Sequence, residues 1–201
     1  MIEEDRIAEK TDEELARDAR AGSRRSFEEL ARRYKRRLFV YLRPRVASDE
    51  DAEDMVQDTF LKLFRGLGGY DPAYKFSAWL YTSAGRLAID SYRKNKAGRN
   101  TVAISADMPI ADPAAGRDPG PGESGLWNAA RVLGGDRFRV LWLRYGEDLT
   151  IEEIAAVVGR TKLAVRVLLH RARTSLAGLV GPEMGRAVGA RPGAAPHAAG
   201  N

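Results

Sequence analysis

The sequence predicts an all-α protein of two small helical domains joined by a flexible linker, the second domain being a helix-turn-helix. Apolar residues recur at helical spacing along two long stretches, and a segment rich in Pro, Gly, Asp and Ala without such spacing separates them. The expected boundaries are 1–98 for the first domain, 99–124 for the linker, 125–181 for the second domain and 182–201 for a disordered tail.

Composition is that of a soluble globular protein. The 201 residues are 44% hydrophobic and 30% charged, and the absence of cysteine excludes disulfides and thiolate metal sites. No apolar run reaches the length of a membrane span and the first residues lack a secretion signal, so we expect a cytoplasmic protein without membrane insertion. The two histidines, His170 and His197, offer no metal or catalytic cluster, and we expect neither a cofactor nor enzymatic activity.

Four helices are expected in the first domain. Thr11 and Glu14 form a capping-box pattern at the start of the first, and Pro44 ends or kinks the second. Ser48 is a good N-cap for the third, and a loop rich in glycine precedes the fourth. The expected helices span about 11–20, 24–44, 48–67 and 76–96.

The helix expected over 48–67 has two different faces. One is an apolar stripe at core spacing, formed by Ala52, Met55, Val56, Thr59, Phe60 and Leu63. The other bears Asp54, Gln57, Asp58 and Leu61, which places an apolar side chain within an acidic patch. Taken alone, these residues leave two interpretations open: a solvated helix face, or a docking surface for a basic partner.

The second domain carries a pattern typical of a helix-turn-helix. Thr150 and Glu153 form a capping box at the start of a short helix, Gly159 supplies a tight turn, and Thr161 caps a helix to about Leu179. In that geometry the second helix enters the major groove, where arginine can bind guanine and other polar side chains can contact phosphates. Its outward-facing candidates are Lys162, Arg166, His170, Arg171 and Arg173.

The net charge of +5 does not by itself indicate nucleic-acid binding, because many proteins are as basic without binding nucleic acid. The distribution of charge along the chain is more informative. Residues 75–99 contain six basic residues against one acid, and residues 160–173 contain five against none. A packed helix pair without DNA binding is the alternative for the second domain, and the absence of acids in this stretch disfavours it.

Three stretches resemble, in order and spacing, bacterial RNA polymerase sigma factors of the extracytoplasmic-function (ECF) group. They read DAEDMVQDTFLKLF, then FSAWLYTSAGRLAIDSYRK, then VLWLRYGEDLTIEEIAAVVG followed by VRVLLHRAR. The resemblance implies a protein that binds core RNA polymerase and directs promoter recognition and melting. Promoter DNA and core polymerase are the implied partners, and an anti-sigma factor, which commonly holds family members, is a further one.

The resemblance also implies roles for individual residues. Polymerase docking, on the clamp helices of the largest subunit, corresponds to Asp54, Gln57, Asp58 and Leu61. Capture of the non-template strand of the minus-ten element corresponds to Tyr74, Lys75, Phe76, Arg86, Arg93 and Lys94. Reading of the minus-thirty-five element corresponds to the helix-turn-helix, with readout positions at Arg166, Val167, His170 and Arg171.

This chain departs from the family pattern at several positions. Gly85 and Arg86 stand where Arg-Asn is usual, so the base preference at the minus-ten element is expected to differ. Val167 can touch a thymine methyl, whereas Leu168 loses a phosphate contact, which together predict an altered or weaker upstream site. The pair Gly134–Gly135 replaces a usual Pro-Glu and is expected to loosen a helix start.

Other interpretations stay open on the sequence alone. Trp79, Phe60 and Trp142 favour core packing over base stacking, whereas Phe76 and Tyr74 suit either role. A stand-alone helix-turn-helix regulator would bind duplex DNA without polymerase and leave the acidic face unexplained. A DNA-processing enzyme would need a nucleophile or metal-binding carboxylates in the first domain, and none converge there.

Overall fold

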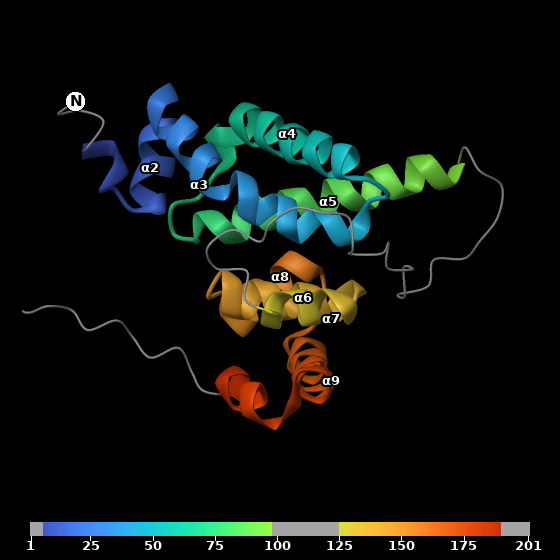
Figure 1. The fold of residues 1–201 in the computed structure, drawn as a ribbon. Helices are drawn as coiled ribbons and strands as arrows, with labels where there is room; N and C mark the ends of the chain where they lie inside the picture. Colours follow the sequence, from blue (N-terminus) through green and yellow to red (C-terminus); the bar gives the residue numbers. More distant parts are fainter. Residues whose placement is uncertain (1–5, 98–124, 190–201) are drawn as a thin grey trace, which may run out of the picture.

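The computed structural model describes residues 6–97 and 125–189, and the side chains of 6–93 and 125–179. Within these ranges every regular element is helical, as predicted, and the helices form two units (Figure 1). The first contains α2 (Asp12–Arg20), α3 (Arg24–Leu42), η1 (Arg43–Arg45), α4 (Asp49–Gly66), η2 (Leu67–Gly69) and α5 (Phe76–Ala97). The second contains α6 (Gly125–Val132), α7 (Gly135–Leu141), η3 (Trp142–Gly146), α8 (Ile151–Val158) and α9 (Lys162–Gly189).

Parts of the prediction lie outside the described residues. These are the linker at 99–124, the end of the tail at 190–201, and the side chain of Lys94. The start of the predicted tail differs from expectation, because α9 continues past Leu179 to Gly189. None of the helices in the described ranges is both long enough and apolar enough to cross a membrane.

Helix starts in the first domain follow local chemistry. Thr11 and Glu14 form the expected capping box at α2, and Ser48 forms another with Asp51 at α4, so exposed backbone amides are satisfied by side chains. α3 ends before the 3-10 turn that contains Pro44, because proline lacks the amide hydrogen that the helix requires.

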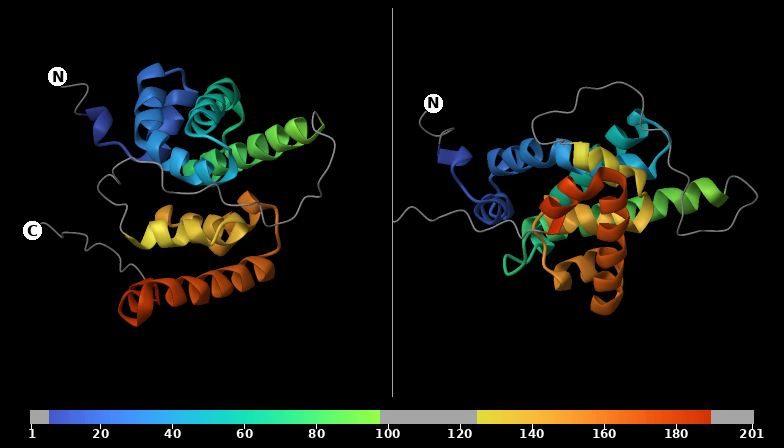
Figure 2. Two further views of the ribbon diagram at one scale, coloured as in Figure 1. Left: turned by 45° about the vertical axis from the view of Figure 1, so that its right-hand side comes forward. Right: turned by 60° about the horizontal axis from the view of Figure 1, so that its bottom comes forward.

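The first domain is layered. α4 lies on the side away from the second domain, whereas α3 and α5 lie between α4 and the second domain (Figures 1 and 2). The core between these helices is aromatic: Tyr41 and Tyr81 are fully buried with ring centroids 4.6 Å apart. Phe60 and Trp79, interpreted as core residues, are partly buried and pack against this core.

The second domain contains the predicted helix-turn-helix in α8 and α9. Thr150 and Glu153 form the capping box at α8, and Gly159 ends it in the left-handed conformation at φ 66°. Trp142 is buried at 7% exposure, as expected. Gly134 and Gly135 adopt φ values of 60° and 45°, so these glycines set a backbone turn into α7 that other residues rarely adopt.

We expect Thr150→Ala to lower the free energy of unfolding by about 1 kcal/mol, because the amide of Glu153 loses its side-chain acceptor at 3.2 Å. Thermal or denaturant unfolding followed by circular dichroism measures the change. Thr150→Ser keeps the hydroxyl and should stay close to the wild type. Equal losses in the two variants would show that the cap contributes nothing.

Candidate functional site

The outward face of α4 combines exposed acids with exposed apolar side chains. Asp54, Gln57 and Asp58 are exposed, Leu61 is 53% exposed and Phe64 is 48% exposed. Within the described residues neither Asp54 nor Asp58 has an ion-pair partner. Acids that form no ion pair within the described residues, bordered by apolar side chains, are suited to a basic partner that also buries apolar surface.

Other acids of the same helix have local roles. Asp51 accepts from the amide of Ser48 at 3.1 Å, and Asp49 forms an ion pair with Arg43. The acidic block in the sequence therefore divides into a first turn that stabilises the helix start and a following turn that faces solvent.

The loop before α5 presents one aromatic side chain to solvent. The buried Tyr70 donates its hydroxyl hydrogen to the carbonyl of Tyr74 at 2.8 Å, and Asp71 accepts from the amide of Ala73 at 2.9 Å. These bonds order the loop and leave the Tyr74 side chain 62% exposed. Arg86 and Arg93 are exposed along α5, which matches the basic surface expected for single-strand binding.

Phe76 does not join this surface. Its side chain is fully buried, with ring centroids 5.5 Å from Tyr34 and 6.0 Å from Trp79. Its amide donates to the carboxylate of Glu13 at 3.3 Å, which fixes the start of α5 against α2. The predicted DNA-contact role of Phe76 is therefore wrong for this structure, because a ring without exposed surface cannot stack on a base.

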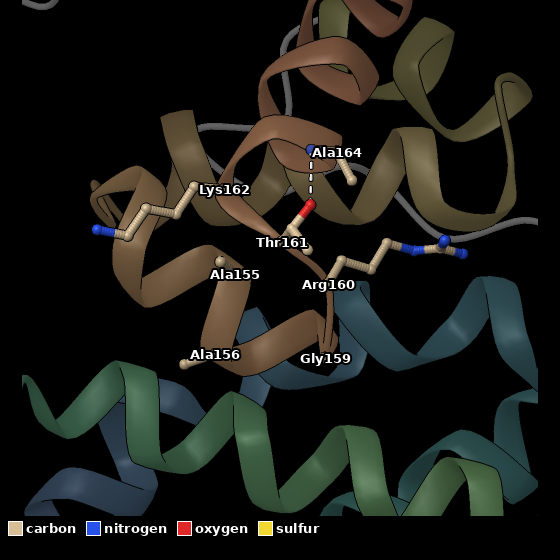
Figure 3. Close-up of a pocket in the computed structure, with 7 residues that line it drawn as sticks. All are labelled: Ala155, Ala156, Gly159, Arg160, Thr161, Lys162 and Ala164. Carbon is tan, nitrogen blue, oxygen red and sulfur yellow. Dashed lines mark hydrogen bonds between the residues drawn. The ribbon is translucent and has the colours of Figure 1, made fainter.

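The turn of the helix-turn-helix is held by short-range bonds (Figure 3). Thr161 caps α9 by accepting from the amide of Ala164 at 3.2 Å. Arg160 and Lys162 point away from each other, and each forms an ion pair, with Asp136 at 2.6 Å and with Glu152 at 3.0 Å respectively. An open groove beside this turn is lined by Ala155, Ala156, Gly159, Arg160, Thr161, Lys162 and Ala164.

The outer face of α9 carries the predicted readout residues. Arg166, Val167, His170, Arg171 and Arg173 are all exposed, and the predicted inner face is buried. The inner residues are Val165, Leu169, Ala172 and Leu176. Side chains on this face are free to meet a DNA groove, since α9 lies on the side of the second domain away from the first (Figure 2).

Two family models match the chain, Sigma-70 region 2 over residues 30–98 and Sigma-70 region 4 over residues 126–176. The chain is 32% identical over 165 residues to the RNA polymerase sigma factor CarQ of Myxococcus xanthus, an alignment covering 81% of this chain and 93% of CarQ. It is 28% identical to the ECF RNA polymerase sigma factor BldN of Streptomyces coelicolor, covering 83% of this chain and 65% of BldN.

The chain belongs to the ECF group of RNA polymerase sigma factors. Among solved structures, that of CnrH in complex with the cytosolic domain of CnrY superposes with a TM-score of 0.58 at 27% identity, covering 84% of this chain and 96% of CnrH. Region 2 of this sigma factor contains the acidic face of α4 and the basic side of α5, and region 4 contains the helix-turn-helix. A sigma factor binds core RNA polymerase and directs promoter recognition, so the stand-alone regulator is not favoured.

Sequence reasoning missed two exposed apolar residues of this sigma factor. Phe64 follows Leu61 by three residues and was absent from the predicted docking face, although helical spacing alone would have included it. Leu163, in the first turn of α9, is 69% exposed and lies one helical turn before Val167, which is 42% exposed. Leu168, by contrast, is partly buried and packs against the region 4 core.

We expect Phe76→Ala to lower the free energy of unfolding by about 3–5 kcal/mol, because it removes a fully buried ring. Tyr74→Ala, at an exposed position two residues away, should change it by less than about 0.5 kcal/mol. Urea unfolding of the two variants measures both effects. A small loss for Phe76→Ala would mean that the ring is not a core residue and would reopen its predicted contact with DNA.

Proposed function

We propose that Asp54, Gln57, Asp58 and Leu61 form the surface through which this sigma factor docks on the clamp helices of the largest polymerase subunit. The observation that carries the proposal is a pair of exposed acids, Asp54 and Asp58, that form no ion pair with any described residue and lie beside an exposed leucine on α4. The acids would steer and orient a basic partner, and burial of Leu61, with Phe64 beside it, would add apolar contact area.

Strand capture is assigned to the start and the exposed side of α5. The exposed ring of Tyr74 supplies a stacking platform, a contact worth about 1–3 kcal/mol per base. Basic side chains beside Tyr74 and along α5 would track the phosphates of the separated strand, and these are Lys75, Arg86, Arg93 and, by resemblance alone, Lys94. Capture of unpaired bases would offset an unstacking cost of roughly a few kcal/mol.

The outer face of α9 is assigned to the duplex of the minus-thirty-five element. Arg166 and Arg171 suit bidentate contacts to guanine, and Leu163 with Val167 forms an apolar pair suited to thymine methyl groups. His170, the remaining predicted readout position, is assigned to the base edges as well, and phosphate contacts would come from Lys162 and Arg173.

Together these surfaces use binding energy to separate DNA strands. Region 4 would set the register on the duplex while region 2 holds the opened strand, and the polymerase would perform the bond chemistry. We therefore propose a non-enzymatic initiation factor that acts in the cytoplasm, a reducing compartment whose proteins do not depend on disulfides, which fits a chain without cysteine.

The docking surface is tested with Asp54→Arg combined with Gln57→Ala. We expect the affinity for core polymerase to fall about tenfold or more, because a new positive charge faces a basic partner. Fluorescence anisotropy of labelled sigma factor with purified core polymerase measures it, alongside promoter-specific transcription. Glu9→Arg, at an exposed acid remote from α4 in sequence, is the charge-matched control. Unchanged binding in the docking variant would reject this assignment.

DNA reading is tested with two arginines of α9. Arg166→Ala should weaken binding of the upstream element by about 1–3 kcal/mol but leave scrambled duplex nearly unaffected, since a base contact is lost. Arg173→Ala should weaken both duplexes to a similar degree and reduce the salt dependence by about one phosphate contact. Binding isotherms over a salt series measure both. Parallel losses for Arg166→Ala on the two duplexes would contradict its role in base reading.

A further inference from the structure

A buried carboxylate joins the two regions of this sigma factor. Glu147, in the turn between η3 and α8, is 6% exposed. Its Oε1 accepts from the hydroxyl of Tyr81 in α5 at 2.5 Å and from Nε of Arg37 in α3 at 3.1 Å. Trp142 of region 4 donates from its indole nitrogen to the same Tyr81 hydroxyl at 3.3 Å. A region 4 carboxylate is thus held inside a polar network that region 2 supplies.

The residues on either side of Glu147 are bound by region 2 as well. The carbonyl of Gly146 accepts from Nη2 of Arg37 at 2.8 Å, and the carbonyl of Asp148 accepts from Nζ of Lys75 at 2.7 Å. Three consecutive residues of one domain therefore contact side chains of the other, which makes this turn a specific point of attachment.

The backbone at and before Glu147 adopts two uncommon conformations, next to the residues that contact region 2. The segment before it, η3, is a π-helix, and Asp148 has a positive φ of 49°. Gly146 lies against Trp142, where an added Cβ would approach the ring to 3.3 Å. Uncommon conformations of this kind persist where surrounding contacts stabilise them, and they are concentrated at functional sites.

A second contact depends on a glycine of α5. Gly85 is buried beneath α7 and α8, and an added Cβ would lie 3.7 Å from a guanidinium nitrogen of Arg139 and 3.8 Å from the carbonyl oxygen of Val157. A methyl group fits at these distances, but a longer side chain does not. Gly85 occupies the position where the resemblance to the ECF group implies arginine.

We propose that the face of region 2 bearing Arg37, Tyr81 and Gly85 is a docking site for the protein's own region 4, entered by Glu147, and that this closed form must open for promoter binding. The functional consequence rests on the proposed function. The minus-ten and minus-thirty-five elements are about 25 base pairs apart, roughly 85 Å of duplex at ~3.4 Å per pair. Two domains in direct contact cannot hold both elements at once, and Lys75 cannot bind phosphate while it binds Asp148.

Closure is coupled to a proton. Burial raises the pKa of Glu147 to about 7, although the charge of Arg37 and the hydrogen bond from Tyr81 act in the opposite direction. Nη2 of Arg37 lies 2.8 Å from Oε2, within ion-pair range, and also donates to the carbonyl of Gly146, so the carboxyl can leave the closed form only by giving up this partner.

The direction of the pH effect follows from the two states. In the open form the Glu147 carboxyl returns to water and its pKa falls toward the ordinary value, so closing takes up a proton. The closed form is therefore favoured at low pH and loses that advantage as the pH rises through about 7.

Other groups near Glu147 do not account for a pH effect in this range. The charged or titratable groups around Glu147 are Tyr34, Arg37 and Tyr41 of α3, Lys75 before α5, Tyr81 of α5 and Arg139 of α7. Burial raises the pKa of each of the three tyrosines, so none of them titrates in this range.

The experiment measures the separation of the two regions in the full chain alone. The protein has no cysteine, so Ala21→Cys with Thr174→Cys, at exposed positions away from the contact between the two regions, allows spin labelling and electron-electron distance measurement. A short separation should dominate at pH 6, and the closed-to-open ratio should fall about tenfold by pH 8. A single long separation at both pH values would overturn the proposal.

Variants separate the contact from general damage to the fold. In the labelled chain, Gly85→Arg should give the long separation at both pH values, whereas Gly85→Ala, for which there is room, should stay closed at pH 6. Glu147→Gln should keep the short separation and remove its pH dependence. Unchanged separation in Gly85→Arg would overturn closure, and an intact pH response in Glu147→Gln would overturn the role of this carboxyl. No polymerase is present, so failure here is distinct from failure of polymerase docking by α4.

Discussion

A carboxylate removed from water must find partners, and the arrangement of this sigma factor depends on how Glu147 finds them. Its partners Arg37 and Tyr81 belong to helices of region 2, so the cost of burying it is offset only while the two regions are in contact. That contact leaves the docking face of α4 and the outer face of α9 on opposite sides of the molecule (Figure 1). The closed form therefore covers part of the strand-capture side and leaves the other two surfaces exposed.

Local ion pairs decide which charges remain for partners. On α4, Asp49 and Asp51 are used at the helix start, whereas Asp54 and Asp58 have no ion-pair partner among the described residues. Near α9, Arg160 and Lys162 form ion pairs within region 4. Exposed ion pairs of this kind contribute little stability and exchange readily, so DNA phosphate can replace a carboxylate as the partner of Lys162.

Much of the fold could be predicted because helix starts and amphipathic faces depend on residues close in sequence. The capping boxes at Thr11 and Thr150 and the turn at Gly159 are of this kind. Phe76 was misread because periodicity does not show whether an aromatic ring at a helix start turns inward, and here Glu13 of α2 holds that start against the core. The extension of α9 past Leu179 was missed because the segment is rich in glycine and alanine and lacks an apolar stripe.

The sequence by itself determined most helix starts, the acidic and basic faces and the family, since each follows from motifs and spacing of neighbouring residues. Only the tertiary structure decided how the two regions meet. Glu147 reads as an ordinary surface acid in the sequence, and its partner Arg37 lies 110 positions earlier in the chain. The burial of a charge depends on everything packed around it in space, and no local pattern contains that information.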